Sequence, residues 1–221
     1  MSAFISWTRK GFGIRNSEVN VIGFVIAALL LATAASGSEV SVSVTAGAMS
    51  SGFARTDYPE TETMTGPQIG VCVTTHRDEW GVRTGLELER RGGSWMDDGH
   101  GDVWELTSIS VPVLLTYRWH VGGFAPELGV GVSGSWLAAT SYERVGNGSE
   151  VPDFLHEFDP RAVAVFGASM GEAKVRPRVE VRADHGLRSL RAAEVVLPDR
   201  RYPEEVYEWS VGLAGGVELG F

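Results

Sequence analysis

The chain has 221 residues, of which 43% are hydrophobic and 21% are charged, and its formal net charge is −9. This hydrophobic content excludes a disordered chain, and the single cysteine excludes a scaffold held together by internal disulfides. The acidic balance argues against nucleic-acid binding, which needs a basic surface. Glycine, with 28 residues, is about twice as frequent as its ordinary ~7%, which indicates a β protein with many turns.

The first 36 residues have the pattern of a secretory signal peptide. Three basic residues precede an uncharged apolar run over residues 21–35, and small residues follow it. The run is shorter than the ~20 residues that a membrane-spanning helix needs. The sequence therefore predicts export, a cleaved signal peptide over residues 1–36 and a mature domain over residues 37–221. An uncleaved amino-terminal anchor and a later start codon are the alternatives.

Eight segments of the mature chain alternate between two kinds of side chain with the period of a β-strand. They are residues 40–48, 69–74, 82–89, 109–119, 124–133, 159–171, 175–184 and 209–221, and the phase of residues 159–171 is ambiguous. Many approach the 9–11 residues that a tilted transmembrane strand needs. No helical pattern occurs outside the signal segment.

The connections between these strands alternate between long and short. Residues 50–66, 93–105, 142–158 and 188–206 are long connections, and residues 77–80, 120–123 and 171–174 are short ones. Short periplasmic turns with longer extracellular loops are typical of outer-membrane barrels. The sequence therefore predicts an all-β fold, an eight-stranded antiparallel up-and-down transmembrane β-barrel in the outer membrane of a Gram-negative-type bacterium. Three of its four long loops are net acidic.

Each predicted strand has an aliphatic face and a face of small, polar and charged residues. If the aliphatic face lies against lipid, the charges fill the lumen, which in an eight-stranded barrel is just wide enough for side chains. The predicted inward charges are Arg83, Glu87, Glu89, Arg91, Arg118, Glu127, Arg176, Arg178, Glu180, Arg182, Asp184 and Glu218. Buried charges need partners, so these residues are predicted to form a salt-bridged plug. A narrow gated pore or a proton path is the alternative.

Aromatic residues are predicted to mark the two membrane surfaces and the end of the chain. Trp80, Trp119, Phe124 and Phe221 would form a periplasmic girdle, and Trp95, Trp104, Trp136, Tyr142, Tyr207 and Trp209 an outer one; packing in a core is the alternative. The terminal Phe221, after an alternating apolar strand, is typical of the signal read by the outer-membrane assembly machinery. An ordinary last strand is the competing interpretation.

One loop segment has the composition of a weak calcium site. Asp97, Asp98 and Asp102 stand close together among glycines, and Ca²⁺ prefers clustered oxygen ligands. The segment lacks the full spacing of an EF-hand, so a solvated loop tip is the simpler interpretation. The five histidines have no metal-ligand spacing, and no cofactor is predicted.

Four segments resemble the PorT-like outer membrane β-barrel family. Residues 85–93 (GLELERRGG) resemble its "GLELxxKGG" segment, residues 109–118 (ISVPVLLTYR) its "LEIPLLLKY" strand, residues 124–131 (FAPELGVG) its "PYLLAGP" strand and residues 180–187 (EVRADHGL) its "ExRYxxGL" strand. The resemblance covers most of residues 40–221. It implies a barrel fold more firmly than an activity.

The sequence favours a non-enzymatic outer-membrane protein that acts structurally or binds a ligand through its acidic loops. Its expected partners are outer-membrane lipid and the assembly machinery, and it is expected to be a monomer. One alternative is a lipid-modifying enzyme of the outer membrane, for which Ser141, His156 and Glu157 are candidates, although no G-x-S-x-G motif occurs. A soluble exported lipocalin-like carrier is the other alternative.

Overall fold

The computed structural model describes residues 7–8, 38–54, 61–97, 100–145, 158–189 and 207–221. Eight long strands make up this structure, and a two-residue strand, β1 (Trp7–Thr8), precedes them. The long strands are β2 (Glu39–Ala54), β3 (Thr61–Arg77), β4 (Trp80–Asp97), β5 (His100–Arg118), β6 (Phe124–Val145), β7 (Phe158–Met170), β8 (Val175–Gly186) and β9 (Tyr207–Gly220). Within the described ranges there is no helix with the length and hydropathy of a membrane span.

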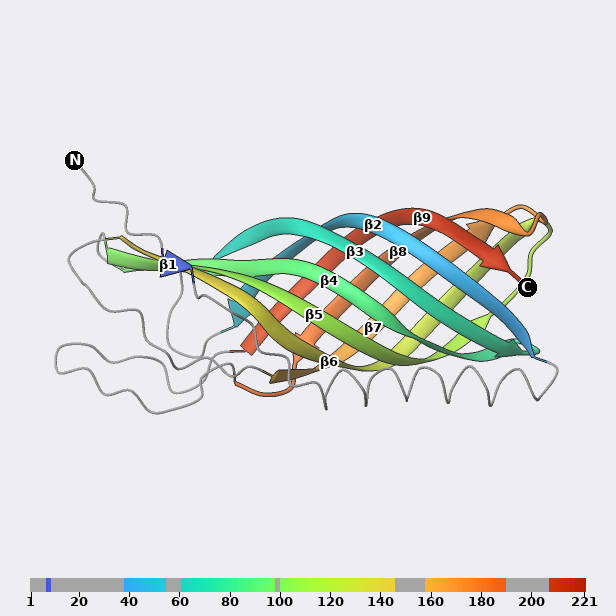
Figure 1. Cartoon of the computed structure of the whole chain (residues 1–221), viewed down its shortest axis with the longest axis horizontal. Coiled ribbons are helices and arrows are strands. Elements are labelled where there is room, and N and C mark those ends of the chain that lie inside the picture. Colours follow the sequence, from blue (N-terminus) through green and yellow to red (C-terminus); the bar gives the residue numbers. More distant parts are fainter. Residues whose placement is uncertain (1–6, 9–37, 55–60, 98–99, 146–157, 190–206) are drawn as a thin grey trace.

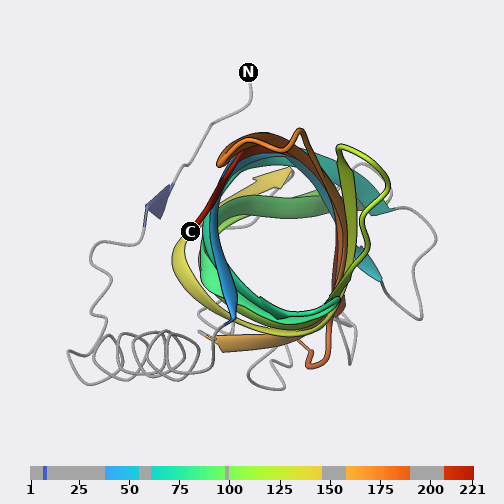
Figure 2. The same cartoon turned by 90° about the vertical axis from the view of Figure 1, so that its right-hand side faces the viewer.

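The eight long strands close into a barrel. Each strand from β2 to β9 pairs antiparallel with the next strand in the sequence, and β9 returns to pair with β2, with Val44 opposite Val217. A view along the barrel shows the closed ring (Figure 2), and a view from the side shows the strands tilted against its long axis (Figure 1). The predicted eight-stranded antiparallel up-and-down barrel is therefore confirmed.

Side chains alternate between the inside and the outside of the barrel, and most of the inner side chains are polar or charged. In β8, Arg178, Glu180 and Arg182 are buried, whereas Val179 and Val181 between them are exposed. This arrangement is the reverse of a water-soluble protein, in which apolar side chains are the ones most often buried. The alternation predicted the inner and outer faces of β8 correctly.

The short connections lie where the sequence predicts them. Asp78 and Glu79 join β3 to β4, residues 119–123 join β5 to β6, and residues 171–174 join β7 to β8. Gly171 has a φ of 94°, a conformation that favours glycine because it has no Cβ. These turns lie at one end of the barrel, and the connections after β2, β4, β6 and β8 lie at the other.

Two of the predicted long loops are wrong, because the strands continue into them. Hydrogen-bonded pairing extends to Ser51 opposite Met64 in β2 and β3, and to Asp97 opposite His100 in β4 and β5. Only residues 55–60 and 98–99 separate these strands. The barrel wall is therefore taller on the side of β2 to β6. On the other side, β7 begins at Phe158, opposite Trp136, and residues 137–145 of β6 extend beyond it.

Strand β1 lies outside the barrel ring. Trp7 and Thr8 pair with Tyr142 and Ser141 of the extended part of β6. Residues 9–37 lie outside the described residues, so the division into a signal peptide and a mature domain stays a prediction. Cleavage after residue 36 would remove β1 and leave the eight barrel strands.

The ambiguous strand β7 has a defined phase in the structure. Asp159, Arg161, Val163 and Val165 are buried inside, and Phe166 is exposed on the outside. The pattern was ambiguous because small and apolar residues occupy both faces of this strand. Val163 and Val165 pack with Leu114 of β5 in an apolar cluster inside the barrel.

Candidate functional site

The structure places all twelve predicted charged residues on the inner face of the barrel. They come from β4 (Arg83, Glu87, Glu89, Arg91), β5 (Arg118), β6 (Glu127), β8 (Arg176, Arg178, Glu180, Arg182, Asp184) and β9 (Glu218). Eleven are buried, and Arg176 is partly exposed at the end near the short turns. Their ion pairs form two groups, which we call the turn-side network and the loop-side network.

The turn-side network contains four arginines and three glutamates: Arg83, Arg118, Arg176, Arg178, Glu127, Glu180 and Glu218. Arg178 is its centre. The Arg178 guanidinium lies 2.7 Å from a Glu127 oxygen, 3.0 Å from Glu218 and 3.1 Å from Glu180. One cation therefore holds carboxylates from β6, β8 and β9.

Every carboxylate of the turn-side network contacts at least two cationic side chains. Glu127 lies 2.8 Å from Arg118 in addition to Arg178, and 3.2 Å from the His76 ring. Glu218 also pairs with Arg118 at 3.0 Å and with Arg176 at 2.6 Å. Glu180 pairs with Arg83 of β4 at 2.8 Å, across the barrel from β8. Such multiple pairing offsets part of the cost of removing these charges from water.

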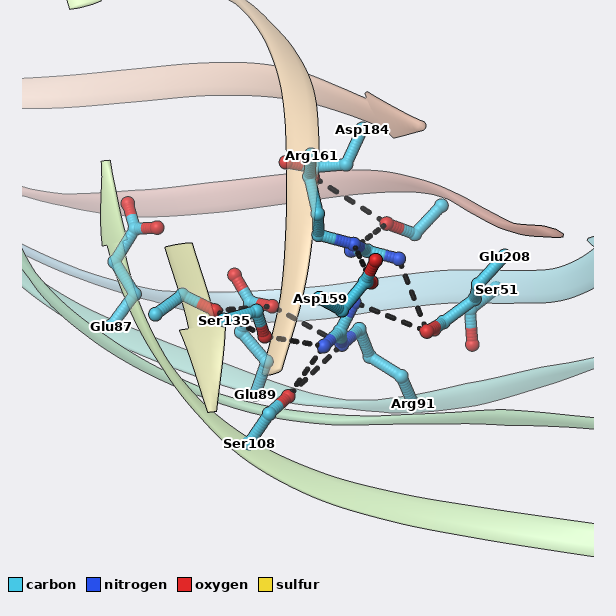
Figure 3. A network of polar contacts seen from close by, with 12 residues as sticks. Ser51, Glu87, Glu89, Arg91, Ser108, Ser135, Asp159, Arg161, Asp184 and Glu208 are labelled. Carbon is cyan, nitrogen blue, oxygen red and sulfur yellow. Dashed lines mark hydrogen bonds and ion pairs between the residues drawn. The ribbon is translucent and has the colours of Figure 1, made fainter. Parts of the chain in front are cut away.

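The loop-side network contains five predicted residues, Glu87, Glu89, Arg91, Arg182 and Asp184, and three that the sequence analysis missed, Asp159, Arg161 and Glu208. Figure 3 shows most of its members meeting inside the barrel. Arg161 lies 2.9 Å from Asp159 and 3.1 Å from Glu208. Glu208 also lies 3.2 Å from Arg91. The network thus continues across strands β7, β9 and β4.

Arg182 holds the other end of the loop-side network. Its guanidinium makes hydrogen bonds of 2.8 Å to both oxygens of Asp184, and it pairs with Glu87 of β4. Serine hydroxyls lie next to the arginines. Arg91 donates hydrogen bonds to Ser108 at 2.6 Å and to Ser135 at 2.8 Å. These small side chains from β5 and β6 leave room for the long arginines.

The three missed charges have a common explanation in strand phase. Asp159 and Arg161 lie in β7, where the alternation is ambiguous. Glu208 lies one residue before the predicted start of the last strand, at an even-numbered position like the inward Ser210 and Glu218. Extending the alternation of β9 by one residue would have found Glu208.

Chemically, the interior is a set of ion pairs that tie distant strands together. Arg83–Glu180 and Arg182–Glu87 join β4 to β8, and Arg118–Glu218 joins β5 to β9. These strand pairs are not neighbours in the sheet, so the side chains cross the inside of the barrel. Among the described residues, no group of three or more His, Cys, Asp or Glu side chains is arranged to hold a metal ion.

Rings at the two ends of the barrel include several of the predicted girdle residues. At the turn end, Trp80 and Tyr117 contact each other with centroids 5.0 Å apart, and Trp119 lies 5.8 Å from Tyr117. At the loop end, Trp136 and Phe158 lie 5.0 Å apart. Tyr117 and Phe158 are additions to the predicted girdles.

The assignment of Trp104 to the outer girdle is wrong. Its side chain is only 3% exposed, because it lies at an even-numbered position of β5, and the even-numbered residues of that strand point inward. The side chains of the girdle candidates Trp95 and Tyr142 lie outside the described part of the structure. Phe124 and Phe221 are exposed at the turn end, as predicted.

The calcium and enzyme candidates lie largely outside the described part. Asp97 and Asp102 belong to the hairpin of β4 and β5, where Trp95 is opposite Asp102, and Asp98 is outside the described residues. Ser141 lies in β6, whereas His156 and Glu157 also fall outside. Both hypotheses stay untested predictions.

Phe221 follows β9 at the turn end. Its backbone N–H donates to the Val40 carbonyl at 2.9 Å, and the residue is 76% exposed. The last residue is thus fixed to the first barrel strand through its backbone, while its side chain is free to contact another molecule.

No family model and no curated protein matches the chain, so the resemblance to the PorT-like family stays a prediction. Among solved structures, the chain is similar to Neisserial surface protein A (14% identity, TM-score 0.46, 81% of this chain and 97% of that one). It is similar to the attachment invasion locus protein Ail of Yersinia pestis (10%, 0.42, 81% and 98%). It is also similar to the outer membrane enzyme PagL (13%, 0.38, 77% and 97%).

Proposed function

We propose that this chain is an outer-membrane β-barrel protein that spans the membrane with β2 to β9. The observation that carries the proposal is a belt of exposed apolar side chains around a buried, charged interior. Every barrel strand contributes to the belt, with Val44, Ile69, Leu86, Leu115, Val130, Phe166, Val179 and Leu213 as examples. Apolar surface in water is unfavourable by roughly 25 cal/mol per Å², whereas a closed barrel in lipid leaves no backbone group unpaired.

The height of the belt supports this proposal. On the outside of β4 it runs from Trp80 to Leu88, and a tilted membrane strand needs about 9–11 residues. The next outward residue, Arg90, is exposed and pairs with Glu105 of β5. The change from apolar to charged side chains between Leu88 and Arg90 is what we expect where the outer surface of the barrel leaves the membrane at the loop end.

The interior argues against a soluble lipocalin-like carrier. Such a carrier needs an apolar lining, whereas most of the buried side chains inside this barrel are charged or polar, and Leu114, Val163 and Val165 form a small apolar cluster among them. For the same reason we propose that the lumen is plugged by its ion pairs. We further propose that the protein is not an enzyme, and that it acts structurally or binds a ligand through its acidic loops.

The first experiment tests the membrane assignment. The chain is expressed with its own amino terminus in a Gram-negative host, the cell fractions are separated, and the gel mobility in SDS is compared with and without heating. We expect the protein in the outer-membrane fraction, with a heat-dependent change in mobility, because a closed barrel resists SDS until it is heated. Recovery in the periplasm without such a change would contradict the proposal.

The same cells test the proposed absence of activity. Lipid A is extracted from cells that express the chain and from cells that carry the empty vector, and the two are compared by mass spectrometry. Identical lipid A is the expected result. A loss of acyl chains would favour a lipid-modifying enzyme instead.

A further inference from the structure

The two networks of the interior differ in their balance of charge. The loop-side network contains five carboxylates (Glu87, Glu89, Asp159, Asp184, Glu208) and three guanidiniums (Arg91, Arg161, Arg182), all of them buried. The turn-side network has four guanidiniums for three carboxylates. Because uncompensated charge is costly to bury, the loop-side network has a deficit of positive charge that the described side chains do not supply.

Glu89 has the longest ion-pair distances of the loop-side carboxylates, whereas Glu208, whose oxygens accept no hydrogen bond, lies closer to its two arginines. The shortest ion-pair distances of Glu89 are 3.3 Å to Arg91 and 3.5 Å to Arg182, whereas Glu127 of the turn-side network is held at 2.7 and 2.8 Å. Ser110 donates to one Glu89 oxygen at 3.4 Å, and the other oxygen, Oε1, accepts no hydrogen bond. Glu89 is only 1% exposed, so water does not replace the missing partners.

Both arginines near Glu89 are committed to other groups. Arg182 is shared with Asp184, which takes its two 2.8 Å hydrogen bonds, and with Glu87. Arg91 places its shortest hydrogen bonds on Ser108 and Ser135 and also pairs with Glu208. Glu89 therefore competes with better-placed acceptors for each of its cations.

Polar and charged groups from seven strands surround this carboxyl. They are Gln68 of β3, Glu87 and Arg91 of β4, Ser108 and Ser110 of β5, Ser135 of β6, Asp159 and Arg161 of β7, Arg182 and Asp184 of β8 and Glu208 of β9, with Glu89 itself on β4. The acids among them are Glu87, Asp159, Asp184 and Glu208. Like charges at close range in a low-dielectric interior favour the neutral form of one of the carboxyls.

We propose that the loop-side network is a proton-binding site and that Glu89 carries the proton in the folded barrel at neutral pH. The bound proton lowers the excess of negative charge in the loop-side network from two to one. The proposal concerns the interior alone and does not depend on the membrane assignment.

The proposal gives the pH dependence of stability an unusual sign. The folded barrel binds a proton that the unfolded chain, with its solvated Glu89, releases at neutral pH. Stability therefore rises as the pH falls, because the unfolded state binds fewer protons than the folded state. A carboxylate held by strong ion pairs, such as Glu127, has the opposite effect.

The test compares three proteins refolded in the same detergent: the unmodified chain, Glu89→Gln and Glu127→Gln. The denaturant midpoint of unfolding is measured from about pH 8 to about pH 5 at constant ionic strength. The unmodified barrel should gain stability on acidification. Glu89→Gln should remove this dependence and be at least as stable as the unmodified barrel at the highest pH, because its amide imitates the neutral carboxyl.

Glu127→Gln is the matched control, since it makes the same substitution in the turn-side network. It should be less stable than the unmodified barrel throughout the pH range. If Glu89→Gln is destabilised to the same extent as Glu127→Gln, or does not refold at all, then Glu89 is an ionised partner and the proposal is wrong.

An infrared measurement reads the proton directly. The unmodified barrel should have a carbonyl band of a protonated carboxyl at neutral pH, and Glu89→Gln should lack it. Replacing the sodium of the buffer by a bulky organic cation should leave the stability of the unmodified barrel unchanged. If the unmodified barrel loses stability in that exchange and Glu89→Gln does not, the site holds a metal cation and the assignment of a proton is overturned.

Discussion

Arg178 and Val179 are neighbours in the sequence with opposite environments. Arg178 is buried against three glutamates, whereas Val179 is 45% exposed on the outer belt. The contribution of each side chain to the stability of the barrel therefore depends on which side of the barrel wall it faces. A pair of substitutions at these two positions separates the interior from the exterior within one strand.

We predict that Arg178→Leu destabilises the barrel by about 3–5 kcal/mol, the cost of breaking a buried pair by removing one partner. The reason is that Glu127, Glu180 and Glu218 would all lose their shared cation. Unfolding in urea, with the barrel in detergent or lipid vesicles, measures the change. A barrel that tolerates Arg178→Leu would show that the interior charges are not mutually dependent.

Substitutions at Val179 are the control. Val179→Leu should be nearly silent, because the side chain faces outward and is 45% exposed, whereas Val179→Arg should cost about 2–4 kcal/mol near the middle of a bilayer. In a barrel surrounded by water the order would reverse, since an arginine there would be solvated. The comparison is made in lipid vesicles, where the exterior is apolar.

At the residue level, the two-residue period of the strands predicted which side chains share a face. The alternation separated the twelve charges from the aliphatic face of their strands, and they were assigned inward because the aliphatic face was expected to lie against lipid. Asp159 and Arg161 were missed because β7 has small residues on both faces. Trp104 was misplaced because it lay in the predicted connection over residues 93–105, to which no strand phase was assigned. The pairing partners were not predictable, since they depend on the register of strands distant in sequence.

The last strand, β9, has two separate roles in the fold. It closes the barrel by pairing with β2 and β8, and it ends in a residue whose ring is exposed at the turn end. Because the Phe221 ring packs so little against the barrel, its contribution to the stability of the folded state is small. A substitution of Phe221 is therefore expected to affect the assembly of the barrel in the membrane more than its stability.

We predict that Phe221→Asp lowers the amount of assembled protein in the outer membrane several-fold, while Phe221→Tyr leaves it unchanged. The expected cause is loss of an aromatic terminus that the assembly machinery reads. The amounts are measured by blotting of membrane fractions. Purified Phe221→Asp should refold in detergent as the unmodified chain does, and a defect in that refolding would assign Phe221 a structural role instead.

The ends of the strands were less predictable than their existence. Between Leu88 and Ile109, β4 and β5 continue past the apolar belt, and their outward side chains there include Arg90 and Glu105. Beyond the belt, the outside of a strand has no reason to be aliphatic, so the alternation that marks it disappears. The strands were therefore predicted only over the height of the belt.

For the whole molecule, the rhythm of strands and connections was sufficient to predict the barrel. Eight alternating segments, joined by turns of a few residues at one end, leave few other closed arrangements. The sequence did not indicate that the wall is taller on the side of β2 to β6. That asymmetry arises from pairing between polar segments, which have no pattern of their own.

We predict that the mature protein begins between Ala35 and Glu39. The basic residues and the apolar run of the first 36 residues favour recognition and cleavage by a signal peptidase. Mass spectrometry of the amino terminus of the membrane-bound protein measures the cleavage site. Detection of Met1 on that protein would mean that the segment is an anchor, and β1 would then be part of the mature structure.

The pairing between β2 and β9, which we call the seam, closes the ring and bears on when the interior ion pairs form during folding. It joins Ser41 to Gly220, and the ion pairs Arg83–Glu180, Arg182–Glu87 and Arg118–Glu218 link residues that are 97, 95 and 100 positions apart. Contacts of such long sequence separation form slowly, because the entropy of closing the loop is lost before the contact is made. No hairpin contains a complete set of these partners. We therefore expect the ion pairs between distant strands to form only when β2 and β9 pair, so that these charges lose their hydration and the ring closes in one late, cooperative step.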